Sequence, residues 1–238
     1  MTSHSKQRVY QSIMTPKIIY IEGNIGTGKT TFCELIDKFL RFQKFKWKIV
    51  LEPVAQWMSM TTSDGSSLLS EFYRDQDKYS FPFQMNSFIS RSYSIHETIR
   101  QNPDLDVIFV ERSVFTDKLC FASMLYESGK MNELEYKIYN EWHSKLVNDF
   151  KLEATGFVYL RTTPEVSHGR IKKRSRDGES GIPLDYLKSL HSRHETWLLT
   201  QEHQEKVLTL DVSGSIFEDE VMTEFTDKIR EYFRLDEV

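Results

Sequence analysis

The sequence predicts a doubly wound, three-layer α/β fold built on a five-stranded parallel sheet. Three observations predict it: short apolar runs recur along the chain, a stretch with helical periodicity follows each run, and the runs are continuously apolar instead of alternating. Continuous apolar runs are typical of strands that are buried on both faces, and right-handed crossovers place the connecting helices over those faces. We therefore expect one sheet with helices on both sides.

The expected strands are short runs rich in β-branched and aromatic residues. They cover residues 18–21, 49–51, 107–110, 157–160 and 207–210. The expected helices cover residues 29–42, 79–100, 115–127, 132–150, 164–174, 183–200 and 217–233. Thr163 before Pro164 predicts an N-cap followed by proline at the first helical position. Residues 181–183 separate the two helices that flank them, and the polar stretch 61–67 predicts a loop within the domain.

Bulk composition limits the classes of protein to be considered. The chain has 238 residues, of which 39% are hydrophobic and 28% charged, as in an ordinary globular protein. A formal net charge of −4 argues against a large nucleic-acid surface, so we expect no nucleic-acid partner. No apolar run approaches the roughly 20 residues of a membrane span, so we expect no membrane partner. The two cysteines, Cys33 and Cys120, are expected to be buried free thiols.

Length and composition also predict the domain organisation. Residues 17–238 are expected to form a single domain, and residues 1–16 a flexible tail. The tail lacks acids and carries Lys6 and Arg8, a weak likeness to a transit peptide, but it shows no amphipathic arginine-rich helix. We therefore expect a cytoplasmic protein, with a mitochondrial location as the weaker alternative.

A phosphate-binding loop follows the first expected strand. Residues 23–30 fit the pattern G-x-x-x-x-G-K-[ST] between a strand and a helix, the setting in which this loop works. Its glycines let backbone amides surround a phosphate, Lys29 would bridge the β- and γ-phosphates, and the Thr30 hydroxyl would bind Mg²⁺. The expected nucleotide-binding residues here are Gly23, Asn24, Ile25, Gly26, Thr27, Gly28, Lys29, Thr30 and Thr31. The expected cofactors are ATP and Mg²⁺, although this loop alone does not separate kinases from switches, motors or transport ATPases.

Acidic residues follow the second and third expected strands. Glu52 stands where a parallel sheet binds ligands, and a kinase that acts on a hydroxyl needs a base there. Glu111 and Arg112 emerge at the same edge of the sheet. Glu111 would hold Mg²⁺ together with Thr30, and Arg112 would stabilise charge on the transferred phosphoryl group. We therefore expect Glu52, Glu111 and Arg112 to be the catalytic residues.

These motifs together resemble the deoxyribonucleoside kinase family, which includes the deoxycytidine and deoxyguanosine kinases. The resemblance spans nearly the whole chain, and its motifs occur in the family's order. They are residues 23–30, Glu52-Pro53-Val54 with Trp57, Phe83-Gln84, Arg91, Glu111-Arg112-Ser113 with Asp117, and residues 170–183. The resemblance implies an α/β homodimer that transfers the γ-phosphoryl group of ATP to a deoxynucleoside.

The resemblance also implies a role for each matched residue. Glu52 would accept the proton of the 5′-hydroxyl, and Arg112 would lie near the reacting 5′ position. Tyr73 and Glu179 would bind the sugar 3′-hydroxyl. The implied substrate-binding residues are Glu52, Trp57, Tyr73, Phe83, Gln84, Arg91, Arg112, Asp117, Phe121 and Glu179. Trp57, Phe83 and Phe121 would enclose the nucleobase, and Gln84 can pair with a base edge in two senses.

A basic segment at about 170–182 resembles a lid over the donor triphosphate. Arg170, Arg174 and Arg176 match the family's lid positions, and arginines there would contact phosphates and exclude water. Gly178 and Gly181 are candidate hinges. Residues 211–217 resemble the loop that borders the donor base, although their spacing departs from the family's pattern.

Arg91 and Asp117 together resemble the branch of the family that acts on deoxycytidine and purine deoxynucleosides. Thymidine-preferring relatives usually leave room for the thymine methyl group, and the small Ser87 would admit a purine. We therefore expect a purine deoxynucleoside or deoxycytidine to be favoured over thymidine, without separating adenine, guanine and cytosine.

Two other functions remain open from the sequence. A nucleoside monophosphate kinase of related fold would need basic residues for its acceptor phosphate, whereas the Glu52 carboxylate would repel a phosphate dianion. A non-catalytic nucleotide-binding protein is the second alternative. A GTP-dependent switch would carry an Asn-Lys-x-Asp motif, and the sequence has none.

Overall fold

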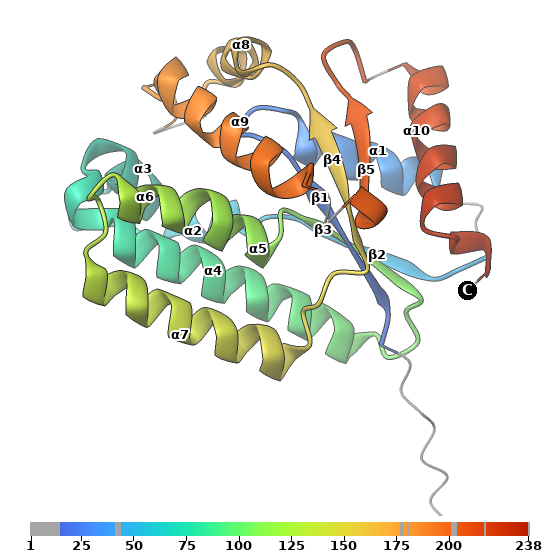
Figure 1. The fold of residues 1–238 in the computed structure, drawn as a ribbon, viewed down its shortest axis with the longest axis horizontal. Helices are drawn as coiled ribbons and strands as arrows, with labels where there is room; N and C mark the ends of the chain where they lie inside the picture. The colour runs from blue at the N-terminus through green and yellow to red at the C-terminus, as the bar shows by residue number, and fades with distance from the viewer. Residues whose placement is uncertain are drawn as a thin grey trace, which may run out of the picture.

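Five parallel strands form one sheet in the order β2-β3-β1-β4-β5, as the computed structural model shows (Figure 1). The strands are β1 (Lys17–Glu22), β2 (Trp47–Val50), β3 (Val107–Glu111), β4 (Gly156–Arg161) and β5 (Val207–Asp211). All five predicted strands are present, and the parallel sheet is confirmed. The structure describes residues 15–40, 44–176, 179, 181–200, 204–216 and 218–237. The expected tail at 1–16 therefore falls almost wholly outside the described residues.

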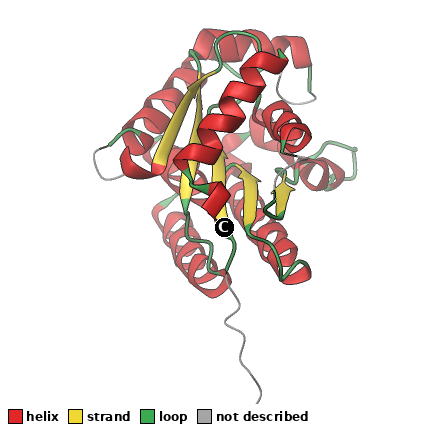
Figure 2. Cartoon of the chain, turned by 90° about the vertical axis from the view of Figure 1, so that its right-hand side faces the viewer, coloured by secondary structure: helices red, strands yellow, loops and turns green. Residues whose placement is uncertain are grey.

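Helices cover both faces of the sheet, so the predicted three-layer architecture is confirmed (Figure 2). Side chains alternate along β1: Ile19 and Ile21 enter one apolar core, while Ile18 and Tyr20 enter the other. Helices α1 (Lys29–Phe39) and α10 (Asp219–Tyr232) bury residues in the first core. Helices α4 (Gln76–Gln101), α7 (Glu133–Phe150) and α9 (Leu184–Leu198) bury residues in the second.

Capping residues set several helix boundaries. The Thr163 hydroxyl accepts a hydrogen bond from the Val166 amide, so α8 (Pro164–Arg174) begins and ends as predicted. Asn132 caps α7 in a capping box with Glu135. Helix α4 begins three residues before the expected Tyr79, because Asp75 accepts from the Lys78 amide and acts as its N-cap. Helix α1 ends at Phe39 instead of residue 42, and residues 41–43 lie outside the described part.

Two short helices were not predicted. Helices α2 (Val54–Ser59) and α3 (Leu68–Arg74) flank the expected loop at 61–67, and six or seven residues carry too little periodicity to be recognised. The helix expected at 115–127 is a composite of α5 (Val114–Thr116), the π-helical segment η1 (Asp117–Ala122) and α6 (Ser123–Glu127). In the described residues, no helix is long and apolar enough to cross a membrane. Cys33 and Cys120 are buried free thiols, as expected.

The chain reverses direction across the sheet between β1 and β3, which lie side by side. Helix α1 follows β1 on one face, whereas α5, η1 and α6 follow β3 on the other. Such a switch point opens a crevice at the carboxyl ends of the two strands. The phosphate loop and Glu111-Arg112-Ser113 both follow these strand ends, so the topology places them together.

Candidate active site

A cleft lies at the carboxyl ends of β1 and β3. It brings together every substrate-binding residue expected from the sequence. Its lining includes Glu52, Trp57, Tyr73, Phe83, Gln84, Arg91, Arg112, Asp117, Phe121 and Glu179, with Ile25, Gly26, Gly28, Lys29, Thr30, Glu111, Arg174 and Arg176 on the phosphate-loop side. An adjoining hollow is lined by Gly26, Thr27, Gly28, Thr31, Arg170, Arg174, Gly214 and Ile216. The two hollows share the phosphate loop and therefore have the arrangement that a donor site and an acceptor site require.

The phosphate loop depends on glycine at its turns. Gly26 has φ +80°, and a Cβ there would come within 2.6 Å of the Ser167 carbonyl oxygen. The Lys29 ammonium donates hydrogen bonds to the carbonyl oxygens of Gly23 (3.1 Å) and Asn24 (2.9 Å). Burial, together with the positive charge of Arg112, lowers the pKa of Lys29 to about 8. The amine is thus held inside the loop, next to where a phosphate would be surrounded.

Helices α9 and α8 brace the same loop. The Asn24 amide donates to the Leu187 carbonyl oxygen (2.8 Å), which ties the loop to α9. Arg170 donates to the carbonyl oxygen of Thr27 (3.0 Å) and to two carbonyl oxygens in the segment 212–214. Arg170, expected to reach the triphosphate, is therefore engaged with main-chain oxygens in this structure.

Glu52 follows β2 and lies between two arginines. Its Oε1 accepts hydrogen bonds from Nη2 of Arg91 (2.8 Å) and from Nε of Arg112 (2.7 Å). Burial alone would raise the pKa of Glu52, but the charges of Arg112, Arg91 and Lys29 outweigh it and lower the pKa to about 2. Glu52 is therefore a carboxylate at neutral pH. Oε2, the second oxygen of Glu52, accepts neither of these two hydrogen bonds.

Arg91 joins the Glu52 carboxylate to a second acid. Arg91 is almost completely buried on α4, and its Nη1 donates to Asp117 in a short hydrogen bond. Asp117 is also buried, so each charge is compensated where water is excluded. Arg112 lies across the ring of Phe121, with its Cζ 4.8 Å from the ring centroid. The sequence interpretation paired Arg91 with Asp117, but it missed the bond from Arg91 to Glu52.

Thr30 and Glu111 meet beside the phosphate loop. The Thr30 hydroxyl donates to Oε1 of Glu111 (2.7 Å), and the other Glu111 oxygen accepts from the Glu52 amide (3.3 Å). Burial, aided by the negative charge of Glu52, raises the pKa of Glu111. A cation bound to Glu111 would stabilise the carboxylate and so lower this pKa. The two residues predicted to bind metal are thus adjacent.

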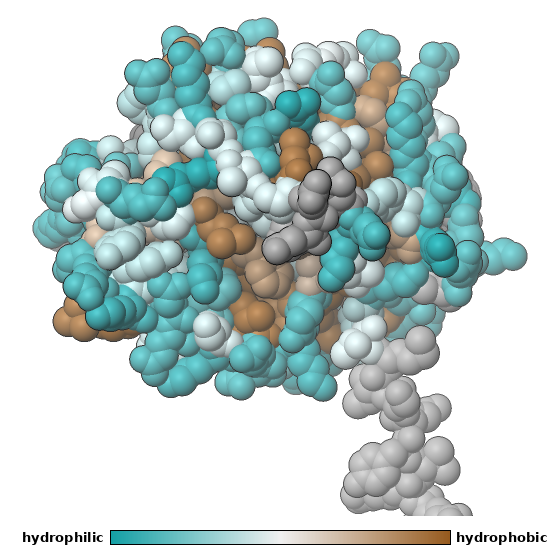
Figure 3. Space-filling model, viewed as in Figure 1, coloured by the Kyte–Doolittle hydropathy of each residue, from teal (hydrophilic) through white to brown (hydrophobic). Residues whose placement is uncertain are grey.

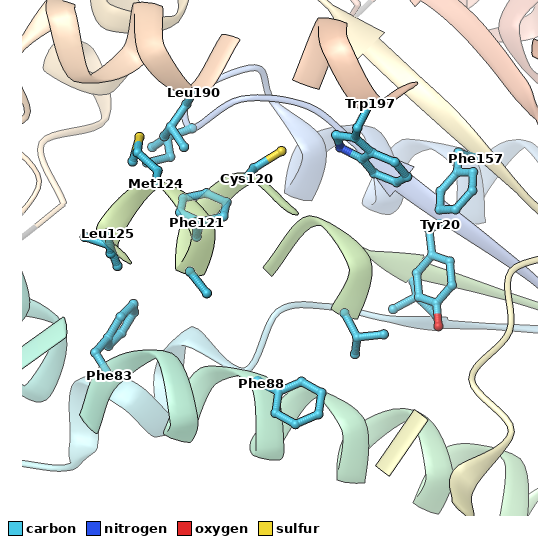
Figure 4. Packing of buried hydrophobic residues seen from close by; sticks show 14 of the residues in the cluster. Tyr20, Phe83, Phe88, Cys120, Phe121, Met124, Leu125, Phe157, Leu190 and Trp197 are labelled. Atoms are coloured by element: carbon cyan, nitrogen blue, oxygen red, sulfur yellow. The ribbon is translucent and has the colours of Figure 1, made fainter. Parts of the chain in front are cut away.

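Aromatic rings form the far end of the cleft. The rings of Phe83 and Phe72 stack at 4.5 Å, and Trp57 meets Phe83 edge to face at 5.6 Å. Figure 4 shows Phe83 and Phe121 projecting from two separate helical elements. The buried Oε1 of Gln84 has no hydrogen-bond partner among the described residues. The end of the cleft is therefore flat-walled and apolar, and it offers an amide oxygen.

Tyr73 and Glu179 border the cleft near the arginines of the expected lid. Arg174 donates a short hydrogen bond to Glu179, and Arg176 donates to its other oxygen (3.0 Å). Burial raises the pKa of Tyr73 well above its ordinary value, so its hydroxyl keeps its proton. Two of the three expected lid arginines therefore contact an acid that lines the acceptor side. Of the two candidate hinges, Gly178 lies outside the described residues.

Sequence reasoning missed several residues that hold this site together. Ser90 accepts a hydrogen bond from the Trp57 indole (2.9 Å), and Phe72 stacks beneath Phe83. Glu22, the last residue of β1, is completely buried and accepts from the Ser113 amide (2.9 Å). The only sequence signal for Glu22 was a carboxylate directly after the predicted strand at 18–21. A buried carboxyl is costly unless it has a specific partner.

Comparisons with known proteins agree with this geometry. The sequence profile of the deoxynucleoside kinase family matches residues 19–234, which is most of the chain. The chain belongs to the deoxynucleoside kinase family. Such kinases phosphorylate nucleosides with ATP as donor, and the phosphate loop beside an acceptor cleft fits that activity. The expected family and fold are thus confirmed.

Individual relatives cover nearly the same length as this chain. It is 37% identical to deoxycytidine kinase 2 of Gallus gallus, over 92% of this chain and 88% of the relative. It is 36% identical to human deoxycytidine kinase, over 91% and 90%. It is 34% identical to the mitochondrial deoxyguanosine kinase of Xenopus laevis, over 83% and 82%. Each match therefore covers more than four fifths of this chain and of the relative.

Proposed function

We propose that this deoxynucleoside kinase transfers the γ-phosphoryl group of ATP to the 5′-hydroxyl of a deoxynucleoside, in nucleotide salvage, with Glu52 as the base. The observation that carries this proposal is the position of the Glu52 carboxylate. It lies between a phosphate loop and an aromatic-walled cleft, with one oxygen fixed by two arginines. A nucleoside whose nucleobase lies between the aromatic rings would direct its sugar toward the Glu52 carboxylate.

Glu52 would act mainly by orienting the acceptor. Arg91 and Arg112 hold Oε1, so the remaining oxygen is the one that would accept the hydroxyl proton. A pKa of about 2 makes Glu52 a weak base. Phosphoryl transfer passes through a loose transition state in which positioning contributes more than base strength, so a weak base that is always ionised suffices.

Arg112 supplies positive charge at the reacting end. Its guanidinium is buried, and its Nη1 has no hydrogen-bond partner within the described residues. An unused donor on a buried guanidinium can stabilise charge that develops on the transferred group. On the donor side, the Lys29 amine would exchange the carbonyl oxygens of Gly23 and Asn24 for phosphate oxygens.

Thr30 and Glu111 are the residues that would hold Mg²⁺. A hydroxyl and a carboxylate 2.7 Å apart provide the oxygen donors that Mg²⁺ prefers, and this ion usually takes most of its ligands from phosphate and water. The described residues contain no cluster of three or more His, Cys, Asp or Glu side chains suited to a metal. Such a cluster is not needed for Mg²⁺ bound with a triphosphate. When bound, the ion would neutralise charge on the donor phosphates.

Arg174 and Arg176 are proposed to belong to a lid at about 170–182 within a single domain at 17–238. Both contact Glu179, whose carboxylate lines the cleft together with Tyr73. Arginines at the rim of a phosphate site can close over a triphosphate and exclude water, which favours transfer over hydrolysis of ATP. Tyr73 and Glu179 are proposed to bind the sugar 3′-hydroxyl.

The preferred acceptor is proposed to be deoxycytidine or a purine deoxynucleoside in preference to thymidine. Gln84 presents an unpartnered amide oxygen, and Asp117 is fixed by Arg91 at the same end of the cleft. The Asp117 carboxylate can only accept hydrogen bonds and so favours a base that presents an exocyclic amino group, whereas the Gln84 amide can pair in either sense. The names of the relatives, deoxycytidine and deoxyguanosine kinases, agree with this proposal.

The test is an ATP-consumption assay with Mg²⁺ that compares deoxyadenosine, deoxyguanosine, deoxycytidine, thymidine and their monophosphates. We expect turnover with the nucleosides and a higher kcat/KM for at least one amino-bearing base than for thymidine. Turnover with monophosphates only would contradict the role of Glu52 and favour the monophosphate kinase. No turnover with any acceptor, despite ATP binding, would favour the non-catalytic alternative.

The protein is proposed to be a homodimer that uses the apolar face of α7. Leu134, Ile138 and Trp142 are spaced by four residues on that helix and are 67%, 37% and 46% exposed. Tyr126 on α6 and Leu119 on η1 are exposed near it in sequence, and Figure 3 shows apolar surface on this side of the molecule. Ultracentrifugation should give twice the monomer mass, and Trp142→Glu should reduce it.

The cytoplasm is proposed as the location, with the mitochondrion as the alternative. One relative is named as a mitochondrial enzyme, whereas the names of the deoxycytidine kinases carry no mitochondrial location. Cell fractionation of the full chain with a C-terminal tag tests this. Recovery of a shortened protein in the mitochondrial fraction would contradict the cytoplasmic location.

A further inference from the structure

Glu22 is a buried carboxyl that the proposed chemistry does not use. It ends β1, the central strand of the sheet, and its side chain is completely buried. Because side chains alternate along a strand, Glu22 points to the same face of the sheet as Tyr20, which is the face that carries the acceptor cleft. Glu22 is not among the residues that line the cleft. It lies behind the site and does not border it.

The Glu22 carboxyl supports the turn that follows β3. The Arg112 amide donates to the Ile21 carbonyl oxygen (2.9 Å), and the next amide, that of Ser113, donates to Oε1 of Glu22 (2.9 Å). Arg112 has φ +63°, a left-handed conformation that costs free energy in a residue with a side chain. The end of β1 therefore holds both amides of a strained turn.

That turn positions two parts of the site. Arg112 projects from it and donates through Nε to Glu52 (2.7 Å). Ser113 is the N-cap of the helical segment that follows, since its hydroxyl accepts from the Thr116 amide (3.0 Å). This segment continues into η1, which carries Asp117 into the cleft. A shift of the turn would move the arginine and the base-binding segment together.

We propose that Glu22 is a positioning residue for phosphoryl transfer, which fixes the Arg112-Ser113 turn through the Ser113 amide and so holds the Arg112 guanidinium at the reacting end. This inference rests on the proposed role of Arg112. Glu22 acts by accepting the hydrogen bond of the Ser113 amide, which an uncharged side chain of the same length can also do.

Stability alone gives no reason for this residue. Within the described residues Oε2 of Glu22 has no well-formed hydrogen bond. The Ser113 and Thr116 hydroxyls act to lower the pKa of the Glu22 carboxyl, but burial outweighs them and raises that pKa. An incompletely satisfied buried carboxyl destabilises a fold relative to an apolar side chain of similar size. Residues that break packing rules in this way occur mainly where function requires them.

Two substitutions separate the length of the side chain from its charge. Glu22→Gln keeps the length and an acceptor oxygen but cannot ionise, whereas Glu22→Asp keeps an ionisable carboxyl and shortens the reach to Ser113. We expect Glu22→Gln to retain kcat within about fivefold of the wild type, as for one altered hydrogen bond. We expect Glu22→Asp to lower kcat on the order of 10²-fold, as for misplacement by about 1 Å, with KM for ATP unchanged.

The assay should be normalised to folded protein, measured by circular dichroism at the assay temperature. Glu71→Gln is the matched control, because Glu71 is also buried with one unpartnered oxygen but pairs with Arg74 away from β1. It should lower Tm without lowering kcat. A defect in Glu22→Asp that appears only in Tm, or only in KM for ATP, would overturn the positioning role.

Other outcomes are equally decisive. If Glu22→Gln loses more activity than Glu22→Asp, or does not fold, the charge matters and the proposal is wrong. If both variants keep wild-type kcat, Glu22 has no positioning role. Arg112→Met, assayed in parallel, checks the proposed function itself: unchanged turnover there would overturn the role of Arg112, whichever result Glu22 gives.

Discussion

Glu52 and Arg91 are joined by a hydrogen bond of 2.8 Å between Oε1 and Nη2, although they come from opposite ends of the β2–α4 segment. Arg91 uses its other terminal nitrogen to bind Asp117 at the base-binding end of the cleft. The buried Arg91 guanidinium therefore connects Glu52, the proposed general base, to the residues that would bind the nucleobase. Changes at the base-binding end should accordingly affect turnover as well as selectivity.

Glu52→Gln is predicted to lower kcat by about 10²- to 10⁴-fold while changing the Kd of the nucleoside only slightly. The amide keeps the shape of the carboxyl group but cannot accept the hydroxyl proton. Single-turnover kinetics and calorimetric binding measure the two quantities separately. An equal loss in both would exclude the base role.

The low pKa of Glu52 predicts how kcat depends on pH in the acid range. Since the pKa of Glu52 is lowered to about 2, its ionised form persists down to that pH. The wild-type kcat should therefore show no decline due to Glu52 between pH 8 and pH 5. Arg91→Met removes one positive charge, so the pKa of Glu52 should rise and kcat should begin to decline at a higher pH than in the wild type. An acid range of kcat that matches the wild type in Arg91→Met would contradict this electrostatic coupling.

Lys29→Ala is predicted to abolish phosphoryl transfer, because the ammonium stabilises the charge on the β- and γ-phosphates. The pKa of Lys29 is lowered to about 8, so its charge is lost as the pH rises through that value. Wild-type kcat/KM for ATP should decline above pH 8. Lys48→Ala, an exposed lysine on β2, is the control and should keep full activity. Wild-type turnover by Lys29→Ala would disprove the phosphate-loop assignment.

The double variant Arg91→Met/Asp117→Ala is predicted to shift preference toward thymidine. Removing the buried pair opens space for a 5-methyl group and removes the acid at the base-binding end. We expect the ratio of kcat/KM for thymidine to that for deoxycytidine to rise by at least about tenfold, the effect of roughly one methyl group in a pocket. Steady-state kinetics with both nucleosides measure the ratio. If it stays constant, the pair does not set selectivity.

Gly26→Ala is predicted to lower Tm and to weaken ATP binding. Its Cβ would come within 2.6 Å of the Ser167 carbonyl oxygen, and φ +80° adds strain of about 1–3 kcal/mol. A shift of roughly 2–4 °C per kcal/mol is expected for a chain of this size. Gly169→Ala on α8 is the control, because nothing lies within 4 Å of its added Cβ. That substitution should leave Tm unchanged or raise it.

Local sequence determined the sheet and the phosphate loop. The three central strands β1, β3 and β4 were recognisable because each is a run of consecutive apolar residues buried on both faces. The edge strands β2 and β5 are partly exposed, and only their short apolar stretches marked them in the sequence. The loop at 23–30 was recognisable because its glycines, lysine and threonine act through local backbone geometry. The α8 boundaries followed from Thr163 and Pro164, which are also local signals.

Only the tertiary structure decided which side chains share partners. The bond from Arg91 to Glu52 spans 39 residues, and that from Glu22 to Ser113 spans 91. Contacts between distant residues have no periodicity, so no pattern in the sequence marks them. Helices α2 and α3 and the π-helical segment at 117–122 also depended on packing, because short or irregular helices gain their stability from neighbouring elements rather than from their own residues.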